Sequence, residues 1–190
     1  GSFIIVDRLT NVTVGAGMIS DAHQTGKHIS TVSAHVTTEE RAARFGQKPV
    51  TVMFIGLSGS GKSSRVEEIL LSTTATKTAV ISTDDIFMEN GEYNFRPEKL
   101  KEYHDLNFHF ASRFMKACEK YDGSAICIID NTNTMKWEYE RYEESAKEHG
   151  FEVAIVKIDW KWEDIPLYAE RNSHGVPEEV IRNQAARWEQ

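Results

Sequence analysis

An apolar run that leads directly into a glycine-rich loop constrains this chain more than any other feature. Residues 50–55 read Val-Thr-Val-Met-Phe-Ile, and residues 56–63 read Gly-Leu-Ser-Gly-Ser-Gly-Lys-Ser. A buried strand followed by such a loop and a helix can hold a nucleoside triphosphate, because backbone N–H groups of residues 57–63 can surround the β-phosphate. The alternative is a glycine turn without a phosphate. The spacing of the motif and the strand before it favour a nucleotide-binding protein.

The side chains of this loop have predicted roles in binding a triphosphate. The Lys62 ammonium can reach the β- and γ-oxygens, and the Ser63 hydroxyl can bind Mg²⁺. We therefore expect ATP and Mg²⁺ as cofactors. The other positions expected to contact the nucleotide are Gly56, Ser58, Gly59, Ser60, Gly61 and Ser64.

Composition limits the class of protein. The 190 residues, of which 40% are hydrophobic and 27% charged, suit one α/β domain with an extension. The net charge of −7 argues against broad electrostatic capture of nucleic acid, although a local basic groove is compatible with it. Cys118 and Cys127 lie in apolar segments without metal-binding spacing, so both are expected in the core. No run is long enough to span a membrane and none resembles a signal peptide, so we expect a cytoplasmic protein without a membrane partner.

The first part of the chain differs from the rest in its sequence pattern. We expect an N-terminal extension at residues 1–48 and a main domain at residues 49–190. Within the extension, residues 3–7 and 12–14 are predicted to form two short strands, and residues 38–44 a short helix. A two-stranded hairpin is rarely stable alone. The extension is therefore expected to need a partner, which can be the main domain, another copy of the chain or a separate domain.

From Pro49 onward, apolar runs alternate with helical patterns in the order typical of βαβ units. Strands are predicted at residues 50–56, 79–82, 125–130 and 152–158. Helices are predicted at residues 62–71, 97–121, 136–149, 163–172 and 177–189. The continuously apolar strands favour a parallel sheet that is covered on both faces. The predicted fold class is α/β: a P-loop NTPase with a doubly wound parallel sheet of four or five strands, flanking helices and a short N-terminal β extension.

An acidic pair ends the second predicted strand of the main domain. Residues 81–85 read Ile-Ser-Thr-Asp-Asp, and in an open α/β sheet the carboxyl ends of strands face the ligand crevice. A carboxylate there can accept a proton from a hydroxyl that attacks the γ-phosphate, and Asp84 is the candidate base. Asp85 is the second candidate for the base and a candidate substrate contact. Alternatively, either residue caps the following turn.

Polar residues also follow the third predicted strand. Residues 128–133 read Ile-Ile-Asp-Asn-Thr-Asn. Asp130 suits an outer-sphere contact to Mg²⁺ through water. Asn131 and Asn133 are candidates to hydrogen-bond the substrate or to hold the loop, and an Asx-turn is an equally good interpretation of Asn133.

A short segment between the last two predicted helices can act as a lid. Residues 171–177 read Arg-Asn-Ser-His-Gly-Val-Pro, so Arg171 can close over the charge that develops on the transferred phosphate.

Two further features have open interpretations. His104, on the long helix, either faces the cleft as a substrate contact or packs in the core, and the aromatic residues of the turn at 89–95 either stack on a base or pack against that helix.

These motifs together resemble the polynucleotide-kinase-like P-loop kinases over residues 50–189. The matching segments are residues 56–63, 82–85, 91–95, 130–133 with Trp137, and 171–177. The resemblance implies a parallel sheet with flanking helices and ATP- and Mg²⁺-dependent phosphorylation of a 5′-hydroxyl of DNA or RNA. It also implies that Asp84 is the base and that Arg171 belongs to the lid. Asp130 departs from the pattern, because it stands one position earlier than the acid of the family's phage member.

The first 20 residues resemble a different protein. Residues 3–19 are similar to the C-terminal strands of the GTPase subunit of sulfate adenylyltransferase, which is fused in some bacteria to adenylylsulfate kinase through a linker similar to residues 20–48. The resemblance implies such a GTPase domain as a covalently preceding partner. The Asp-Gly-Asp-Asn and Ile-Ser-Pro segments of adenylylsulfate kinases do not follow the glycine-rich loop in this chain.

The predicted function is therefore an ATP- and Mg²⁺-dependent kinase that transfers the γ-phosphate to a hydroxyl of a nucleotide or polynucleotide. The motifs favour a 5′-hydroxyl polynucleotide acceptor, and the fusion context favours the 3′-hydroxyl of adenylylsulfate. A non-catalytic ATP-binding module that signals to an attached GTPase domain is an alternative of another class. A structural nucleic-acid binder fits the acidic composition least well.

Overall fold

The computed structural model describes residues 2–6, 13–18, 48–121 and 123–189. The chain divides into two units, residues 1–34 and 35–190, which we describe separately. The predicted division at residues 48 and 49 stays a prediction.

The first unit contains one antiparallel hairpin. Its strands are β1 (Ser2–Val6) and β2 (Thr13–Met18), and Ser2 pairs with Met18. The two predicted strands are thus confirmed, although β2 runs four residues beyond the predicted end at residue 14. The helix predicted at residues 38–44 lies outside the described residues.

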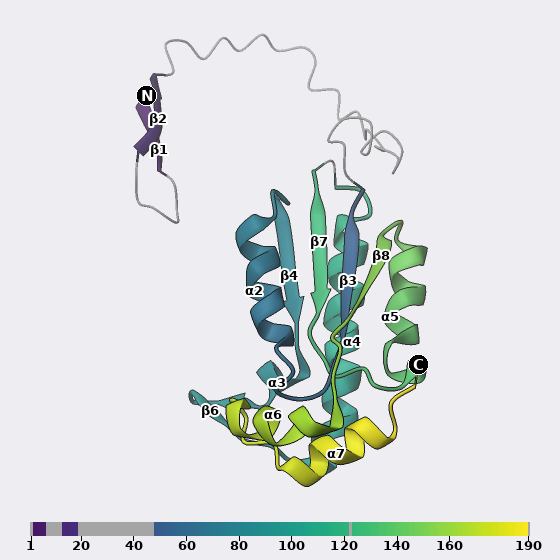
Figure 1. The fold of residues 1–190 in the computed structure, drawn as a ribbon. Helices are drawn as coiled ribbons and strands as arrows, with labels where there is room; N and C mark the ends of the chain where they lie inside the picture. Colours follow the sequence, from purple (N-terminus) through teal and green to yellow (C-terminus); the bar gives the residue numbers. More distant parts are fainter. Residues whose placement is uncertain (1, 7–12, 19–47, 122, 190) are drawn as a thin grey trace. The chain divides into compact units, whose positions relative to one another are not determined.

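A four-stranded parallel sheet forms the centre of the second unit. Its strands are β3 (Val50–Ile55), β4 (Lys77–Ile81), β7 (Ala125–Ile129) and β8 (Glu152–Lys157). They lie in the order β4-β7-β3-β8, so β7 lies between β3 and β4, the two strands that come first in this unit (Figure 1). The parallel α/β sheet predicted from the sequence is confirmed. Because the strands are parallel, the residues that follow them gather at one edge of the sheet.

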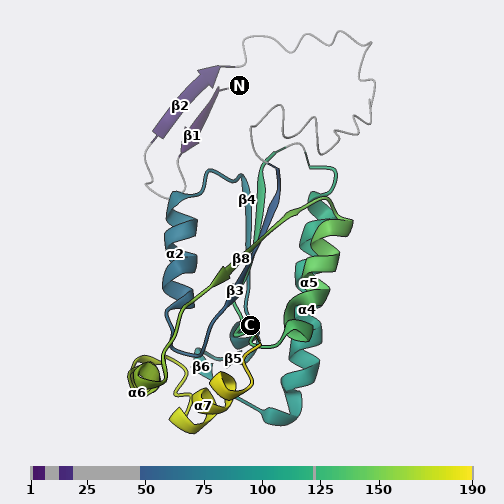
Figure 2. The same ribbon diagram turned by 45° about the vertical axis from the view of Figure 1, so that its right-hand side comes forward.

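Helices cover both faces of the sheet. One face carries α2 (Lys62–Ser72), and the other carries α4 (Leu100–Cys118) and α5 (Lys136–Glu148) (Figure 2). This doubly covered arrangement is the reason why β7 is apolar at every position, and β3 at every position except Thr51, rather than at alternate ones.

Successive residues of the central strand pack into two separate cores. Val52 and Phe54 of β3 pack with Val66 of α2, whereas Met53 packs with Met115 of α4 and Tyr142 of α5; the last three residues belong to a second cluster. Both predicted core cysteines, Cys118 and Cys127, are buried in that second cluster. Burial of each such side chain contributes about 1.5–3 kcal/mol to folding.

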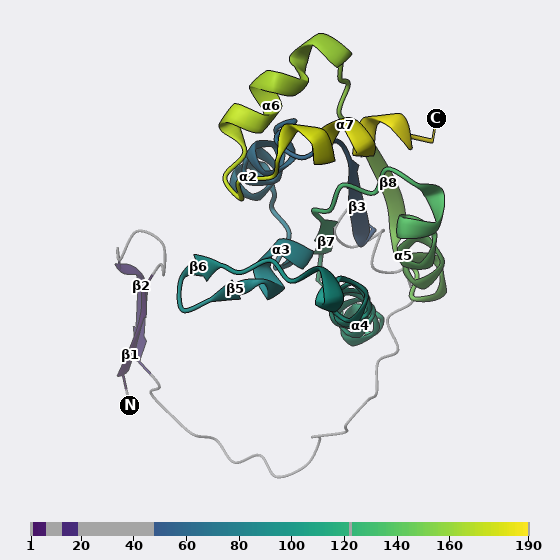
Figure 3. The same ribbon diagram turned by 90° about the horizontal axis from the view of Figure 1, so that it is seen from below.

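Short elements gather at the carboxyl edge of the sheet (Figure 3). Those near the second strand are α3 (Thr83–Ile86), β5 (Met88–Glu89), β6 (Glu92–Tyr93) and the 3₁₀ helix η1 (Pro97–Lys99). Those that follow the fourth strand are the 3₁₀ helix η2 (Trp162–Asp164), α6 (Ile165–Arg171) and α7 (Glu178–Ala186).

The predicted elements and the structure differ most in and around the long helix. The long helix begins at Leu100 rather than residue 97, because Pro97 opens a separate 3₁₀ turn, and it ends at Cys118 rather than residue 121. Helix α3 and the β5–β6 hairpin were not predicted. Asn90 and Gly91 form the two-residue turn of that hairpin with φ of 54° and 86°, as the Asn-Gly pair favours. Within the described residues, no helix combines the length and the apolar character needed to cross a membrane.

Candidate active site

The glycine-rich loop at residues 56–61 connects β3 to α2 at the carboxyl edge of the sheet. The Gly56 N–H donates a hydrogen bond to the Thr132 carbonyl at 3.0 Å, which joins this loop to the one after β7. Gly59 and Gly61 have φ of 74° and 100°, a left-handed region that favours glycine. The glycines of the motif are therefore required by the backbone path of the loop.

The elements α6 and α7 brace this loop from outside the sheet. Leu57 is fully buried in a cluster with Ile165, Tyr168 and Ile181. A Cβ atom at Gly59 would overlap the carbonyl oxygen of Tyr168, so helix and loop are in close contact. The last two helices thus pack directly on the loop that the motif defines.

Lys62 lies at the mouth of the loop. Its ammonium donates hydrogen bonds to the carbonyls of Gly56 at 3.1 Å and Leu57 at 2.9 Å, and the residue is 9% exposed. Burial lowers the pKa of Lys62, while the negative charges of Asp130 and Asp84 act in the opposite direction. Two carboxylates from two other strands therefore lie close enough to influence this ammonium.

Asp130 and Ser63 form a cluster of oxygen atoms beside Lys62. The Ser63 hydroxyl donates to Asp130 Oδ2 at 2.9 Å, and Asp130 Oδ1 is buried without a hydrogen-bond partner among the described residues. Burial raises the pKa of Asp130, and the charge of Lys62 and the Ser63 hydrogen bond oppose that shift. A serine hydroxyl and an unpartnered carboxylate oxygen fit Mg²⁺, which is usually bound by one or two carboxylates together with substrate phosphates.

Asp84 and Asp85 differ in their surroundings. Asp84, in the first turn of α3, accepts a hydrogen bond from the Tyr93 hydroxyl at 2.9 Å, and its Oδ2 lies 3.7 Å from His174 Nε2. Asp85 is exposed. Burial, and next the charge of Asp84, raise the pKa of Tyr93. Of the two acids, Asp84 is the one held by other side chains at this edge.

The two predicted asparagines hold the loop after β7. Asn133 is 3% exposed and donates from Nδ2 to the Phe54 carbonyl at 2.8 Å, with a φ of 48°. Asn131 Oδ1 accepts from the Thr83 N–H at 2.9 Å, while its Nδ2 is buried without a partner among the described residues. These contacts favour the loop-holding interpretation for Asn133 and leave Asn131 Nδ2 available to a ligand.

His104 lies next to the first turn of α3, which carries Asp84 and Asp85. Its Nδ1 is 3.2 Å from the Thr83 hydroxyl, one residue before Asp84. Burial is the largest effect on the pKa of His104 and lowers it. The structure therefore places His104 beside the acidic pair but half-buried.

Arg171 is the last residue of α6 and reaches back to the glycine-rich loop. Its Nε donates to the Gly59 carbonyl, and its guanidinium lies 4.9 Å from the centre of the Tyr168 ring.

Of the predicted serines, Ser60 has a buried hydroxyl without a partner among the described residues, and Ser64 is exposed on the first turn of α2. All the predicted loop positions therefore lie at one end of the sheet.

Three residues have contacts at the site that were not predicted from the sequence. Tyr93, one of the aromatic residues of the turn at 89–95, and His174, in the segment at 171–177, approach Asp84, and Gln184 of α7 hydrogen-bonds Ser58. His174 belongs to the same short segment as Arg171, so its position in the motif was a usable signal. Gln184 had no comparable signal, because its contact depends on how α7 packs.

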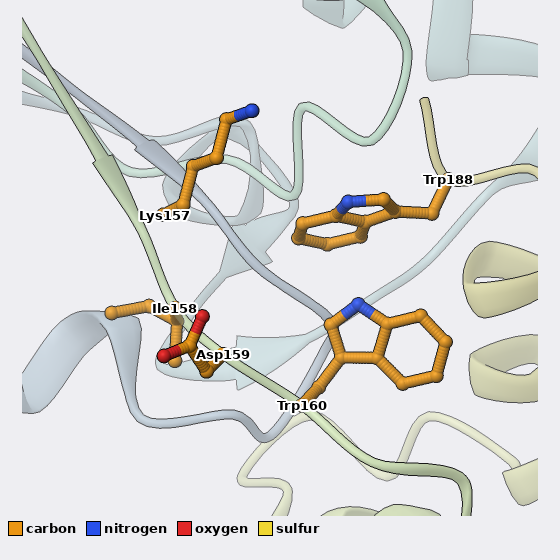
Figure 4. A pocket seen from close by; sticks show the side chains of 5 residues that line it. All are labelled: Lys157, Ile158, Asp159, Trp160 and Trp188. Atoms are coloured by element: carbon orange, nitrogen blue, oxygen red, sulfur yellow. The ribbon is translucent and has the colours of Figure 1, made fainter. Parts of the chain in front are cut away.

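Two adjoining cavities lie on the β8 side of the loop. One, of about 640 Å³, is lined by residues that include Ser60, Gly61 and Arg65. The other, of about 390 Å³, is lined by five residues: Lys157, Ile158, Asp159, Trp160 and Trp188. Figure 4 shows the indole rings of the second cavity close to each other beyond the end of β8; their centres are 5.8 Å apart. The segment at residues 157–159 lines both cavities.

Comparison with known proteins bears on this arrangement. The bifunctional enzyme CysN/CysC of Rhodopirellula baltica is 48% identical over 105 residues, which cover 48% of this chain and 16% of that protein. Human NEDD4-binding protein 2 is 37% identical over 133 residues, which cover 70% of this chain and 7% of that protein. The chain thus spans less than a fifth of the length of either relative.

A solved structure shares the fold. A chain in the structure of the Pnkp1/Rnl/Hen1 RNA repair complex matches with a TM-score of 0.53 and 16% identity, covering 73% of this chain and 43% of that chain. The resemblance predicted from the motifs and the N-terminal segment is confirmed by these matches. A family model described as an AAA domain matches residues 51–190. With its glycine-rich loop, parallel sheet and flanking helices, the chain belongs to this AAA-domain family.

Proposed function

We propose that the main domain transfers the γ-phosphate of ATP to a hydroxyl group of a nucleotide or polynucleotide in the presence of Mg²⁺. One observation carries the proposal: Ser63, next to Lys62 at the end of the P-loop, donates its hydroxyl to Asp130 after β7, and Asp84 follows β4 at the same edge of the sheet. A P-loop with one acid after the adjacent strand β7 and another after β4, the next strand in the sheet, suits phosphoryl transfer, in which catalysis is mainly positioning and charge stabilisation.

The described residues supply the groups that this reaction needs. The acceptor oxygen forms a bond to the γ-phosphorus, the bond from that phosphorus to the β–γ bridging oxygen breaks, and Asp84 takes the hydroxyl proton. Lys62 leaves its two loop carbonyls to neutralise the β- and γ-oxygens, and Arg171 closes over the transferred group. Ser63 would bind Mg²⁺ and Asp130 would contact the ion through water, and the bound ion would neutralise charge on the phosphates.

The two sides of β3 indicate the direction of the bound ATP. Asp130 and Asp84 follow β7 and β4, which lie on one side of β3, whereas β8 and the 640 Å³ cavity lie on the other. The γ-phosphate therefore points toward the acids, and the base extends past Gly61 toward the cavity. Arg65, which lines that cavity, offers an apolar stem and a charged group to the base.

A 5′-hydroxyl polynucleotide is the acceptor that we favour. The motifs that resemble polynucleotide-kinase-like enzymes extend over both the loop and the acidic turn, and those specific to adenylylsulfate kinases are missing from the sequence. The relationship to a bifunctional CysN/CysC enzyme supports adenylylsulfate as the second candidate, with a preceding GTPase domain as partner. A cytoplasmic location stays a prediction.

A side-by-side acceptor assay tests the proposal. The protein is incubated with γ-labelled ATP, Mg²⁺ and one acceptor: a 5′-hydroxyl oligonucleotide, adenylylsulfate or a nucleoside monophosphate. We expect label on the oligonucleotide and none with Lys62→Ala. Label on adenylylsulfate alone would replace the acceptor assignment. ATP binding without transfer to any acceptor would overturn the kinase proposal in favour of a non-catalytic module.

A further inference from the structure

Two aromatic side chains from separate elements meet at Asp84, and we call them the Asp84 clamp. Tyr93, in β6, donates its hydroxyl to Asp84 Oδ1 at 2.9 Å. His174, in the segment between α6 and α7, has its Nε2 3.7 Å from Asp84 Oδ2. The two rings also pack on each other, with centres 4.5 Å apart and planes at 36°. Each oxygen of the carboxylate therefore faces a different element.

The hairpin holds Tyr93 in place. Phe87 is 1% exposed and packs edge-on against the Tyr93 ring at 6.0 Å, while Phe95 is parallel to the Tyr93 ring at 6.5 Å and 12° and also contacts Phe87 at 5.1 Å. The Asn94 N–H donates to the Phe87 carbonyl at 2.9 Å and closes the base of the hairpin. The hydroxyl of Tyr93 therefore points at Asp84 from a ring whose position is fixed by its packing against Phe87 and Phe95.

The turn that carries His174 is held in a different way. The side-chain oxygen of Asn172 accepts hydrogen bonds from the backbone N–H groups of His174 at 2.9 Å and Val176 at 3.1 Å. This turn directly follows Arg171, whose side chain contacts the glycine-rich loop. His174 therefore belongs to the segment that is proposed to close over the phosphates, so the clamp connects that segment to the acid.

We propose that Tyr93 and His174 are positioning residues that orient the Asp84 carboxylate for the acceptor. The inference rests on the proposed function. Rotation about the bond to a carboxylate is soft, so an unrestrained Asp84 would sample many orientations. Tyr93 occupies Oδ1 and leaves Oδ2 to receive the hydroxyl proton. His174 lies against the Tyr93 ring beside Oδ2. It thereby holds the segment that carries Arg171 at a fixed position relative to the Asp84 carboxylate.

Two conservative variants test the positioning role in steady-state kinetics. Tyr93→Phe keeps the ring and removes only the hydroxyl that faces Asp84, whereas His174→Phe keeps an aromatic ring in the cluster and removes the imidazole nitrogens, including the Nε2 that faces Asp84. We expect Tyr93→Phe to lower kcat by about 10- to 100-fold, the scale of a misplaced reacting group, with an unchanged KM for ATP. His174→Phe is expected to lower kcat less. Tyr103→Phe is the matched control, since Tyr103 packs against Phe87 at 4.7 Å without touching Asp84, and it should retain wild-type kcat.

A comparison with Asp84→Ala separates positioning from independent substrate contact. If Tyr93 acts through Asp84, then adding Tyr93→Phe to Asp84→Ala lowers kcat no further. A loss that multiplies in the double variant would overturn the positioning role, because Tyr93 would then act on the substrate by itself. Wild-type kcat in Tyr93→Phe or in His174→Phe would remove that residue from the clamp.

The same variants give a readout that needs no activity. The free energy of unfolding is measured for wild type, Tyr93→Phe, Asp84→Ala and the double variant. Residues in direct contact show a non-additive change, whereas independent sites are additive. We expect non-additivity, and additivity would overturn the clamp whether or not the protein is a kinase. The two measurements can also disagree. If no acceptor is labelled but the unfolding free energies are non-additive, the geometry of the clamp is confirmed, whereas the proposed function and the catalytic role of the clamp are contradicted.

Discussion

Gln184 and Ser58, which are 126 residues apart in the sequence, are joined by two hydrogen bonds. The Ser58 N–H donates to Gln184 Oε1 at 3.0 Å, and Gln184 Nε2 donates to the Ser58 hydroxyl at 3.0 Å. One side chain of α7 thus satisfies both a backbone and a side-chain group of the glycine-rich loop. The shape of the loop therefore depends on a helix that shares no sequence motif with it.

Replacement of Gln184 by alanine should destabilise the protein and weaken ATP binding. The change removes both partners of Ser58 in a part-buried position, which typically costs about 1–3 kcal/mol. Denaturant unfolding and calorimetric titration with ATP and Mg²⁺ measure the two effects. Asn183→Ala, at the exposed neighbouring position, is the control and should change neither. Equal unfolding midpoints for Gln184→Ala and wild type would contradict the bracing role.

A methyl group added at Gly59 should be more harmful than one at Gly91. Both glycines have a positive φ, 74° and 86°, so alanine is strained by about 1–2 kcal/mol at either position. Only at Gly59 does the added carbon meet the Tyr168 backbone; at Gly91 nothing lies within 4 Å. Gly59→Ala should therefore show the larger loss of unfolding free energy. Similar losses of unfolding free energy in the two variants would mean that α6 can move away from the added methyl group at little cost.

Loss of the Asp84 carboxylate should abolish most transfer without affecting ATP binding. We expect Asp84→Ala to lower kcat by about 10²–10⁴-fold, the usual contribution of a general base. Asp85→Ala is the matched control, because Asp85 is exposed beside it on α3, and it should retain most activity. The two variants are compared with the acceptor that is labelled in the wild type. A larger loss in Asp85→Ala would assign the base to the other acid.

Removal of the Asp130 charge should raise the requirement for magnesium. Asp130 receives the Ser63 hydroxyl at 2.9 Å, so it orients the group expected to bind the metal. Loss of such an outer contact typically weakens metal affinity about 10–100-fold, and the Mg²⁺ concentration for half-maximal activity of Asp130→Asn should rise accordingly. Glu67→Gln removes one exposed charge from α2 and controls for net charge. An unchanged magnesium dependence would exclude Asp130 from the metal site.

His104 should make the stability of the protein depend on pH. Burial lowers its pKa below 6.5 in the folded state, so the unfolded chain binds the proton more tightly. The free energy of unfolding should therefore rise with pH up to about 6.5 and fall as the pH drops through the folded pKa. Chemical denaturation between about pH 5 and pH 7 should show a flatter dependence for His104→Gln than for wild type. The same slope in both proteins would contradict this account.

The fold could be predicted from the sequence because its signals are local. The continuous apolar runs at residues 50–55 and 125–129 indicate strands buried on both faces, and the loop between strand and helix has its own motif. Asp84 and Asp130 could be chosen as candidates because residues after parallel strands meet at one edge. A turn at residues 89–95 was predicted as well, and its Asn-Gly pair also favours the two short strands of the β5–β6 hairpin that flank it.

The details of the site depend on packing that no local pattern records. Asp84 and Asp85 are neighbours of the same type, and they are distinguished by the approach of Tyr93 and His174 to Asp84 and by the exposure of Asp85. Asn133 carries the same chemistry as Asn131, yet its amide is committed to the Phe54 carbonyl. Such distinctions arise from contacts between elements that are far apart in the chain.

The bracing of the loop by α7 has a consequence for biosynthesis. Ser58 leaves the ribosome 126 residues before Gln184, an interval of about 6–25 s at translation rates of about 5–20 residues per second. Throughout that interval the nascent chain has its glycine-rich motif but not the helix that supports it. Competence to capture nucleotide is thus acquired only after α7 has been synthesised and has docked on the loop.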